Sequence, residues 1–153
     1  MALVKDQEPA GTAADQWCMV HASCVVTEGG GILIHGASGS GKSELALQLM
    51  AMGAVLVSDD QTIVHRRDEE LWASAPTATR GMIEARGIGL LAAESVARAR
   101  VGLSVDLDRL EVERLPEMRY RELLGLRVPT VHKVESAAFP AAVLQFVKGG
   151  RCA

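Results

Sequence analysis

The stretch that most constrains this chain is Gly-Ala-Ser-Gly-Ser-Gly-Lys-Ser at positions 36–43. It matches the pattern Gly-x-x-x-x-Gly-Lys-Ser/Thr, in which a loop between a buried strand and a helix wraps around a phosphate group. The flanking sequence suits that setting, because the apolar run 32–35 precedes the loop and the run 44–52 follows it without Gly or Pro. We therefore predict an α/β fold, with the loop joining a strand to a helix.

The residue types of the loop indicate how it would bind a nucleoside triphosphate. Glycines adopt backbone angles that turn successive N–H groups toward one anion, and the helix that starts there adds the positive end of its dipole. The lysine is a mobile charge for the β- and γ-phosphates, and the final serine hydroxyl is a hard oxygen ligand for Mg²⁺. The predicted phosphate-binding residues are Gly36, Ala37, Ser38, Gly39, Ser40, Gly41, Lys42 and Ser43.

The composition narrows the function classes. Apolar residues make up 48% of the 153 residues and aromatic residues 3%, so we expect a core of Ala, Val, Leu, Ile and Met. The formal net charge of -3 does not favour nucleic-acid binding. No apolar run reaches the length of a membrane span or a signal peptide, which predicts a cytoplasmic protein with no membrane partner. Three cysteines, at 18, 24 and 152, fit no metal or redox spacing, and we interpret them as ordinary side chains rather than a thiol sensor.

One domain is expected at residues 16–149, after a flexible arm at 1–15 and before a short tail at 150–153. Turn-forming residues separate the apolar runs into two hairpins, and a right-handed crossover through the loop's helix leads to a buried parallel strand, so the sheet should be mixed. A short helix is expected at 117–124, and Ser136 is expected to cap a last helix with Pro140 in its first turn. Strands are predicted at 16–26, 32–35, 54–57, 61–65, 71–74, 101–107 and 130–134.

Two adjacent carboxylates, Asp59 and Asp60, end the strand that follows the loop's helix. In a doubly wound sheet such strand ends face the ligand crevice. One carboxylate could hold Mg²⁺ while the other accepts the proton of an attacking hydroxyl, whereas a solvated turn explains an Asp pair equally well when it is taken alone.

Four features of the sequence, taken in their order along the chain, resemble the catalytic domain of bacterial HPr kinase/phosphorylase. The resemblance rests on His21 upstream of the loop, the loop itself, the aspartate pair, and Ile-Glu-Ala-Arg-Gly-Ile-Gly at 83–89, and it covers roughly residues 20–134. It implies a P-loop nucleotide-binding domain of the HPr kinase/PEP carboxykinase type. It further implies ATP and Mg²⁺ as cofactors and the phosphocarrier HPr as protein partner, and it leaves open whether the chain forms a homo-oligomer.

The resemblance also implies roles for individual residues. Asp59 would be the general base toward an HPr serine, with His21 beside it. Asp60 and Glu84 would join Ser43 in holding Mg²⁺ and its shell, while Lys42 would stabilise the transferred phosphoryl group. Arg86 would lie either near that phosphoryl group or in the loop that contacts HPr. The other histidines, His35, His65 and His132, are interpreted as structural.

The chain departs from the family near residue 133. The family has a Gly-Arg-Asn loop there, implicated in the reverse reaction with inorganic phosphate, whereas this chain reads Val-His-Lys-Val-Glu at 131–135. Lys133 does not reproduce a planar guanidinium, so we predict a serine kinase and leave phosphorolysis open. A nucleotide-sensing module without transfer and a small-molecule kinase are the alternatives.

Overall fold

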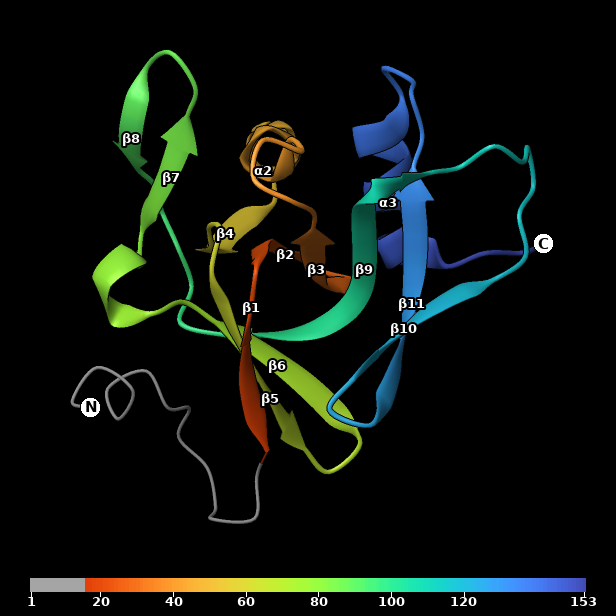
Figure 1. The fold of residues 1–153 in the computed structure, drawn as a ribbon, viewed down its shortest axis with the longest axis horizontal. Coiled ribbons are helices and arrows are strands. Elements are labelled where there is room, and N and C mark those ends of the chain that lie inside the picture. Colours follow the sequence, from red (N-terminus) through yellow and green to blue (C-terminus); the bar gives the residue numbers. More distant parts are fainter. Residues whose placement is uncertain (1–15) are drawn as a thin grey trace.

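The computed structural model describes residues 16–153, so the predicted arm at 1–15 lies outside the described residues. A nine-stranded mixed sheet, two helices packed on one of its faces and a separate hairpin make up the fold (Figure 1). In chain order the elements are β1 (Trp17–Val20), β2 (Ala22–Thr27), β3 (Gly30–His35), α2 (Lys42–Ala51), β4 (Val55–Ser58), β5 (Thr62–Arg67), β6 (Glu70–Ser74), the 3-10 helix η1 (Thr77–Thr79), β7 (Met82–Ala85), β8 (Gly89–Ala92), β9 (Ala99–Leu110), β10 (Arg119–Leu123), β11 (Leu126–Lys133) and α3 (Phe139–Gly149).

The strand order β1-β5-β6-β9-β3-β2-β4, with β11 and β10 attached beside β9, confirms the mixed sheet. The P-loop strand β3 runs parallel to β9, and β9 runs parallel to β11. β4 differs from the prediction, because it pairs antiparallel with β2 instead of lying next to a parallel strand. It still runs in the same direction as β3, since β2 is antiparallel to both. The carboxyl ends of β3 and β4 therefore lie at the same edge of the sheet.

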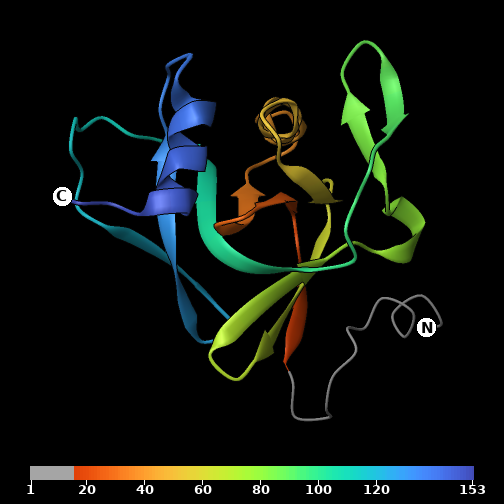
Figure 2. The same cartoon turned by 180° about the vertical axis from the view of Figure 1, so that it is seen from behind.

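The long strand β9 connects the two parts of the sheet. Its first residues pair with β6, and the rest pairs with β3 and β11. Figures 1 and 2 show β9 curving strongly between these partners, so that β1, β5 and β6 lie on the side of the sheet away from α2.

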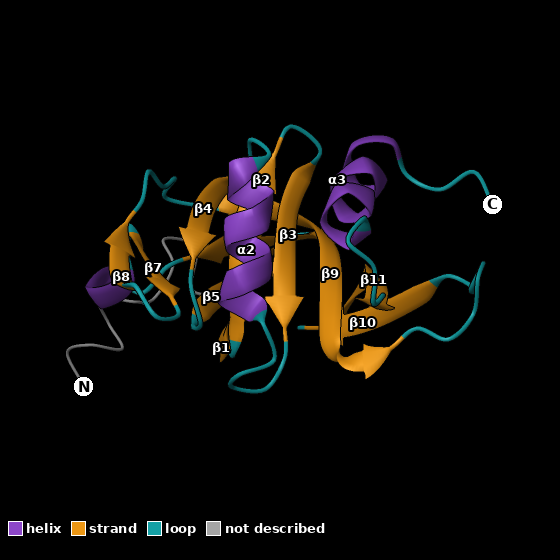
Figure 3. Ribbon diagram, turned by 90° about the horizontal axis from the view of Figure 1, so that it is seen from above, coloured by secondary structure: helices purple, strands orange, loops and turns teal. Residues whose placement is uncertain are grey.

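Alternating apolar residues give each face of the central strands its own core. Ile32 and Ile34 of β3 pack toward α2 and α3, whereas Leu33 packs toward β5 and β6. Figure 3 shows α2 and α3 side by side over the first of these faces. Among the described residues, no methionine is fully buried, contrary to the prediction, and Phe139 and Cys24 join the Ala, Val, Leu and Ile of the cores.

Two local predictions are wrong. The predicted helix at 117–124 is the strand β10, in which half-buried and exposed residues alternate, and Leu124 with φ 49° begins the tight turn into β11. Ala138, not Ser136, occupies the N-cap of α3; the Ser136 hydroxyl instead accepts the Ala138 N–H at 3.1 Å. Pro140 does lie in the first turn of α3, as expected. Within residues 16–153, no helix is long and apolar enough to cross a membrane.

Candidate active site

The P-loop joins β3 to α2 as the pattern predicts. Gly39 and Gly41 have φ angles of 83° and 101°, which residues with a Cβ rarely adopt. Gly36 is restricted by space instead, because a Cβ there would overlap the Ser40 hydroxyl. The three glycines therefore serve the shape of the loop.

Lys42 places its charge at the centre of this loop. Its side chain is 5% exposed, and its Nζ donates to the carbonyl oxygens of Gly36 at 2.8 Å and Ala37 at 3.1 Å. It lies in the first turn of α2, where unpaired backbone N–H groups and the helix dipole favour an anion. The Lys42 ammonium group and the backbone N–H groups at the start of α2 are therefore suited to bind phosphate oxygens.

Asp59 is buried, and both of its carboxylate oxygens accept hydrogen bonds. Its Oδ1 accepts hydrogen bonds from the hydroxyls of Ser43 and Ser23, both at 2.7 Å, and its Oδ2 accepts the backbone N–H of Glu84 at 3.0 Å. The pair of Ser43 and Asp59 presents two hard oxygen atoms at the start of α2, which is the ligand chemistry that Mg²⁺ prefers. These two residues therefore suit a magnesium ion that arrives with a nucleotide.

Asp60 has the opposite environment, although it is the next residue. Its side chain is 58% exposed, its φ is 65°, and its Oδ1 lies 3.8 Å from Lys42 Nζ. His21, at the break between β1 and β2, contacts the same oxygen through Nε2 at 2.8 Å. The predicted partner of His21 was Asp59, so the structure changes this pairing. An exposed carboxylate next to Lys42 is accessible to an incoming hydroxyl.

Ser23 was missed by the sequence analysis. Its hydroxyl donates to Asp59 and accepts the backbone N–H of Asp60 at 3.1 Å, so it sets the turn that separates the two carboxylates. The signal available in the sequence was a serine between apolar neighbours in the predicted strand 16–26, two positions after His21.

Asp108 was also missed. Both of its carboxylate oxygens accept the N–H of Ala37, at 3.0 and 3.1 Å, and thereby hold the start of the P-loop. Its own N–H donates to Asp106, which lies opposite His35 in the register of β9 and β3. The signal in the sequence was a pair of aspartates, Asp106 and Asp108, at alternate positions at the end of the predicted strand 101–107.

The hairpin of β7 and β8 brings Glu84 and Arg86 to the site. Both are exposed and line a cavity of about 790 Å³ together with Lys42, Asp59 and Asp60. An Arg86 nitrogen comes within 3.9 Å of the position that a Cβ on Gly39 would occupy. Within residues 16–153, no group of three His, Cys, Asp or Glu side chains is placed to hold a metal ion by itself. A predicted site made of Ser43, Asp60 and Glu84 would therefore depend on phosphate oxygens as further ligands.

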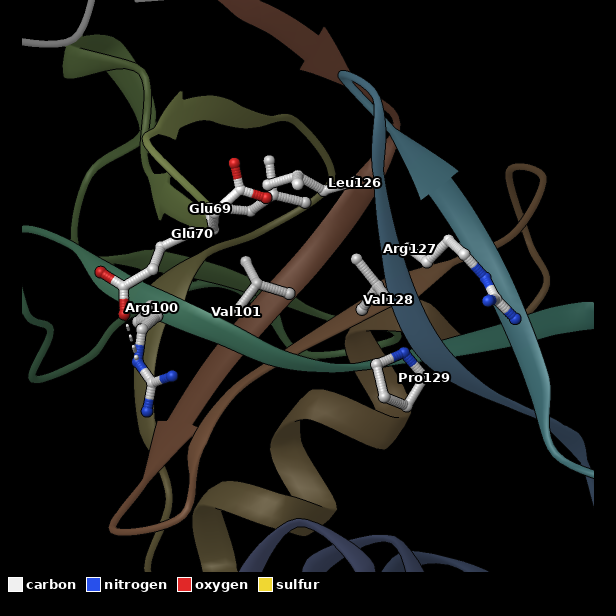
Figure 4. Close-up of a pocket in the computed structure, with 9 residues that line it drawn as sticks. Glu69, Glu70, Arg100, Val101, Leu126, Arg127, Val128 and Pro129 are labelled. Carbon is white, nitrogen blue, oxygen red and sulfur yellow. Dashed lines mark ion pairs between the residues drawn. The ribbon is translucent and has the colours of Figure 1, made fainter.

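A second cavity, of about 310 Å³, adjoins the other flank of the P-loop, between α2 and the connection from β11 to α3. A third cavity, of about 90 Å³, lies at the beginning of β9, away from the P-loop. It is beside the ion pair of Arg100 and Glu70, whose charged atoms are 3.6 Å apart (Figure 4). It is smaller than typical ligand pockets.

Outside the cavity, His35 and two of the cysteines have shifted pKa values. His35 is 4% exposed, and burial lowers its pKa to about 4, with the nearby Arg121 charge acting in the same direction and Asp106 opposing it. The three cysteines are free; burial raises the pKa of Cys24 to about 12 and that of Cys18 above its usual value. A reactive thiol needs the opposite shift.

Comparison with known proteins identifies similar chains. A family model described as HPr Serine kinase C-terminal domain matches residues 13–132. The HPr kinase/phosphorylase of Mycoplasmopsis pulmonis is 41% identical over 100 residues, which cover 65% of this chain and 31% of that relative. The one from Caldanaerobacter subterraneus subsp. tengcongensis is 40% identical over 111 residues, covering 70% of this chain and 36% of that relative. The chain thus spans about a third of the length of these curated relatives.

A solved structure has the same fold. The Hpr(Ser) kinase/phosphatase from Coxiella burnetii superimposes with a TM-score of 0.72 at 28% identity, covering 86% of this chain and 94% of that one. The match confirms the predicted α/β fold class.

Proposed function

The chain belongs to the family of HPr serine kinase C-terminal domains, and from this premise we propose that it transfers the γ-phosphoryl group of ATP to a serine hydroxyl of the phosphocarrier HPr. The observation that carries the proposal is the position of Asp60: an accessible carboxylate, 3.8 Å from the P-loop lysine and hydrogen-bonded to His21. A site that only binds nucleotide has no use for a proton acceptor at this point.

We propose that the two aspartates have the reverse of the roles predicted from sequence. Asp59 is buried and already bonded to Ser43, so it suits the ligand shell of the metal. Asp60 is exposed and suits the general base. A bound Mg²⁺ would neutralise charge that develops on the phosphate oxygens.

In the reaction, the serine oxygen bonds to the γ-phosphorus while its proton passes to the Asp60 carboxylate. The bond from the γ-phosphorus to the bridging oxygen breaks, and ADP leaves. Lys42 would give up its loop carbonyl partners to bind phosphate oxygens, and Arg86 is close enough to the loop to share their charge. His21 would orient Asp60 and share the transferred proton.

The proposal concerns the forward direction. Phosphorolysis, which the names of the relatives include, runs from inorganic phosphate and phosphoserine to pyrophosphate. Lys133, the replacement for the family's arginine, lines the cavity on the other flank of the P-loop from Asp60. It is therefore not positioned with the groups that we assign to the reacting phosphoryl.

The test is transfer of label from γ-labelled ATP to purified HPr with Mg²⁺. Loss of a general base slows transfer by about 10²–10⁴-fold, and we expect Asp60→Asn to show this with ATP affinity changed little. Asp59→Asn should instead raise the Mg²⁺ concentration needed for half-maximal transfer. Asp68→Asn is the matched control, because Asp68 is also exposed and has a positive φ of 54° but lies on the β5–β6 turn.

A normal transfer rate in Asp60→Asn, with loss of transfer in Asp59→Asn at saturating Mg²⁺, would return the base to Asp59. Tight ATP binding without label on HPr would favour the nucleotide-sensing alternative.

A further inference from the structure

Cavities open on both flanks of the P-loop, and we propose that the smaller one, between α2 and the β11–α3 connection, is the nucleoside pocket. The larger cavity would then receive the acceptor serine of HPr. This inference rests on the proposed function, since it assigns the two ends of one phosphoryl-transfer reaction to two places.

The reacting end of the triphosphate belongs to the larger cavity. Ser43, Asp59 and Asp60 line that cavity and do not line the smaller one. A γ-phosphate next to them leaves the rest of the triphosphate to run along the loop. Gly41 lines both cavities, whereas Ser40 lines only the smaller one. The loop therefore continues from the larger cavity into the smaller one, and the α-phosphate end and its nucleoside lead there.

The direction of attack supports the same assignment. In phosphoryl transfer, the attacking and leaving oxygens lie roughly in line on opposite sides of the phosphorus. The base Asp60 must be on the side of the attacking serine. A nucleoside in the larger cavity would therefore block the approach of the acceptor.

The walls of the smaller cavity suit a base and a ribose. Its volume of about 310 Å³ is within the range of small-molecule pockets. Phe139 and Pro140, buried at the start of α3, provide an apolar wall, and Val134 adds to it. The exposed Gln48 amide of α2 can both donate to and accept from a base edge, and the Glu135 carboxylate can accept bonds from ribose hydroxyls.

The larger cavity suits a protein segment. It is lined by exposed side chains of the β7–β8 hairpin, with Ile88 78% exposed and Leu90 65% exposed beside Arg86. A wide surface with exposed apolar residues at its rim is typical of a protein contact.

The assignment is tested by comparing the affinities of ATP and inorganic tripolyphosphate. Both bind the P-loop through phosphates, but only ATP has a nucleoside. We expect Ala137→Trp, at an exposed position in the wall of the smaller cavity, to weaken ATP binding at least about tenfold and to leave tripolyphosphate binding unchanged. Leu90→Trp, the matched block in the larger cavity, should change the affinities for ATP and tripolyphosphate by the same factor and slow transfer to HPr.

Gln48→Trp narrows the same cavity from α2 and is a second variant if Ala137→Trp does not fold. Independently, 8-azido-ATP should label the tryptic peptide 134–148 and not the peptide 87–98, which belongs to the hairpin. A loss of ATP binding in Leu90→Trp without an equal loss of tripolyphosphate binding, or label on 87–98, would overturn the assignment. If the unaltered chain binds neither ATP nor tripolyphosphate, it is the proposed function that fails.

Discussion

Acidification should destabilise the fold through His35, the residue directly before the P-loop. Its folded-state pKa of about 4 lies below the 6.5 of an unburied histidine, because burial penalises the charged imidazole and Arg121 repels it. Each tenfold difference in proton affinity corresponds to about 1.4 kcal/mol, so the protonated side chain costs the folded state about 3 kcal/mol. This is a large part of the stability of a small domain.

The direction of the change in stability depends on whether the folded or the unfolded chain binds the proton. Between pH 6.5 and 4 the unfolded chain protonates this imidazole and the folded chain does not, so stability falls as the pH falls. Above pH 6.5 this side chain contributes no pH dependence, and below pH 4 it causes no further loss. The effect is thus confined to a window that lies mostly above the titration of ordinary carboxyl groups.

Urea unfolding at a series of pH values from 7.5 to 4 measures the effect. In the unaltered chain the free energy of unfolding should decline as the pH falls, and in His35→Gln this decline should be smaller by about 3 kcal/mol. His132→Gln, on the half-buried end of β11, should show the same decline as the unaltered chain. NMR titration should find the His35 imidazole neutral at pH 5. An imidazole that titrates near 6.5, or equal pH profiles for His35→Gln and the unaltered chain, would refute the reasoning.

Three further predictions concern other parts of the fold, two of them from close contacts at glycines and one from a pair of opposite charges. A Cβ on Gly29 would overlap the backbone of α3, so Gly29→Ala should lower the free energy of unfolding by about 2 kcal/mol in urea titrations. Gly36→Ala should leave the fold intact by circular dichroism but weaken tripolyphosphate binding at least about tenfold, because the P-loop must shift. The Arg119 guanidinium holds the pKa of Glu111 at about 2, and Arg119→Gln should return it toward 4.5 in an NMR titration.

The parts of the fold that sequence predicts well are those in which local pattern and packing agree. The P-loop unit combines a loop motif, an apolar strand and a helix without Gly or Pro, and the structure has β3, loop and α2 in that order. β10 shows the opposite case. Its residues Arg119–Leu123 are acceptable in a helix, and only pairing with β11 across a turn with φ 49° at Leu124 makes them a strand. Pairing partners of this kind are not visible in a window of a few residues.

The aspartate pair marks the same limit within the site. Sequence indicates that two carboxylates end a strand, but the choice between their roles depends on a single turn. Because Asp60 has a left-handed φ of 65°, its side chain leaves the strand direction that Asp59 follows. Asp59 remains among Ser23, Ser43 and the backbone of β7, while Asp60 meets His21 and solvent. The hydroxyl of Ser23 holds this turn from a strand 36 positions away, so the different environments of the two adjacent carboxylates are determined by a tertiary contact.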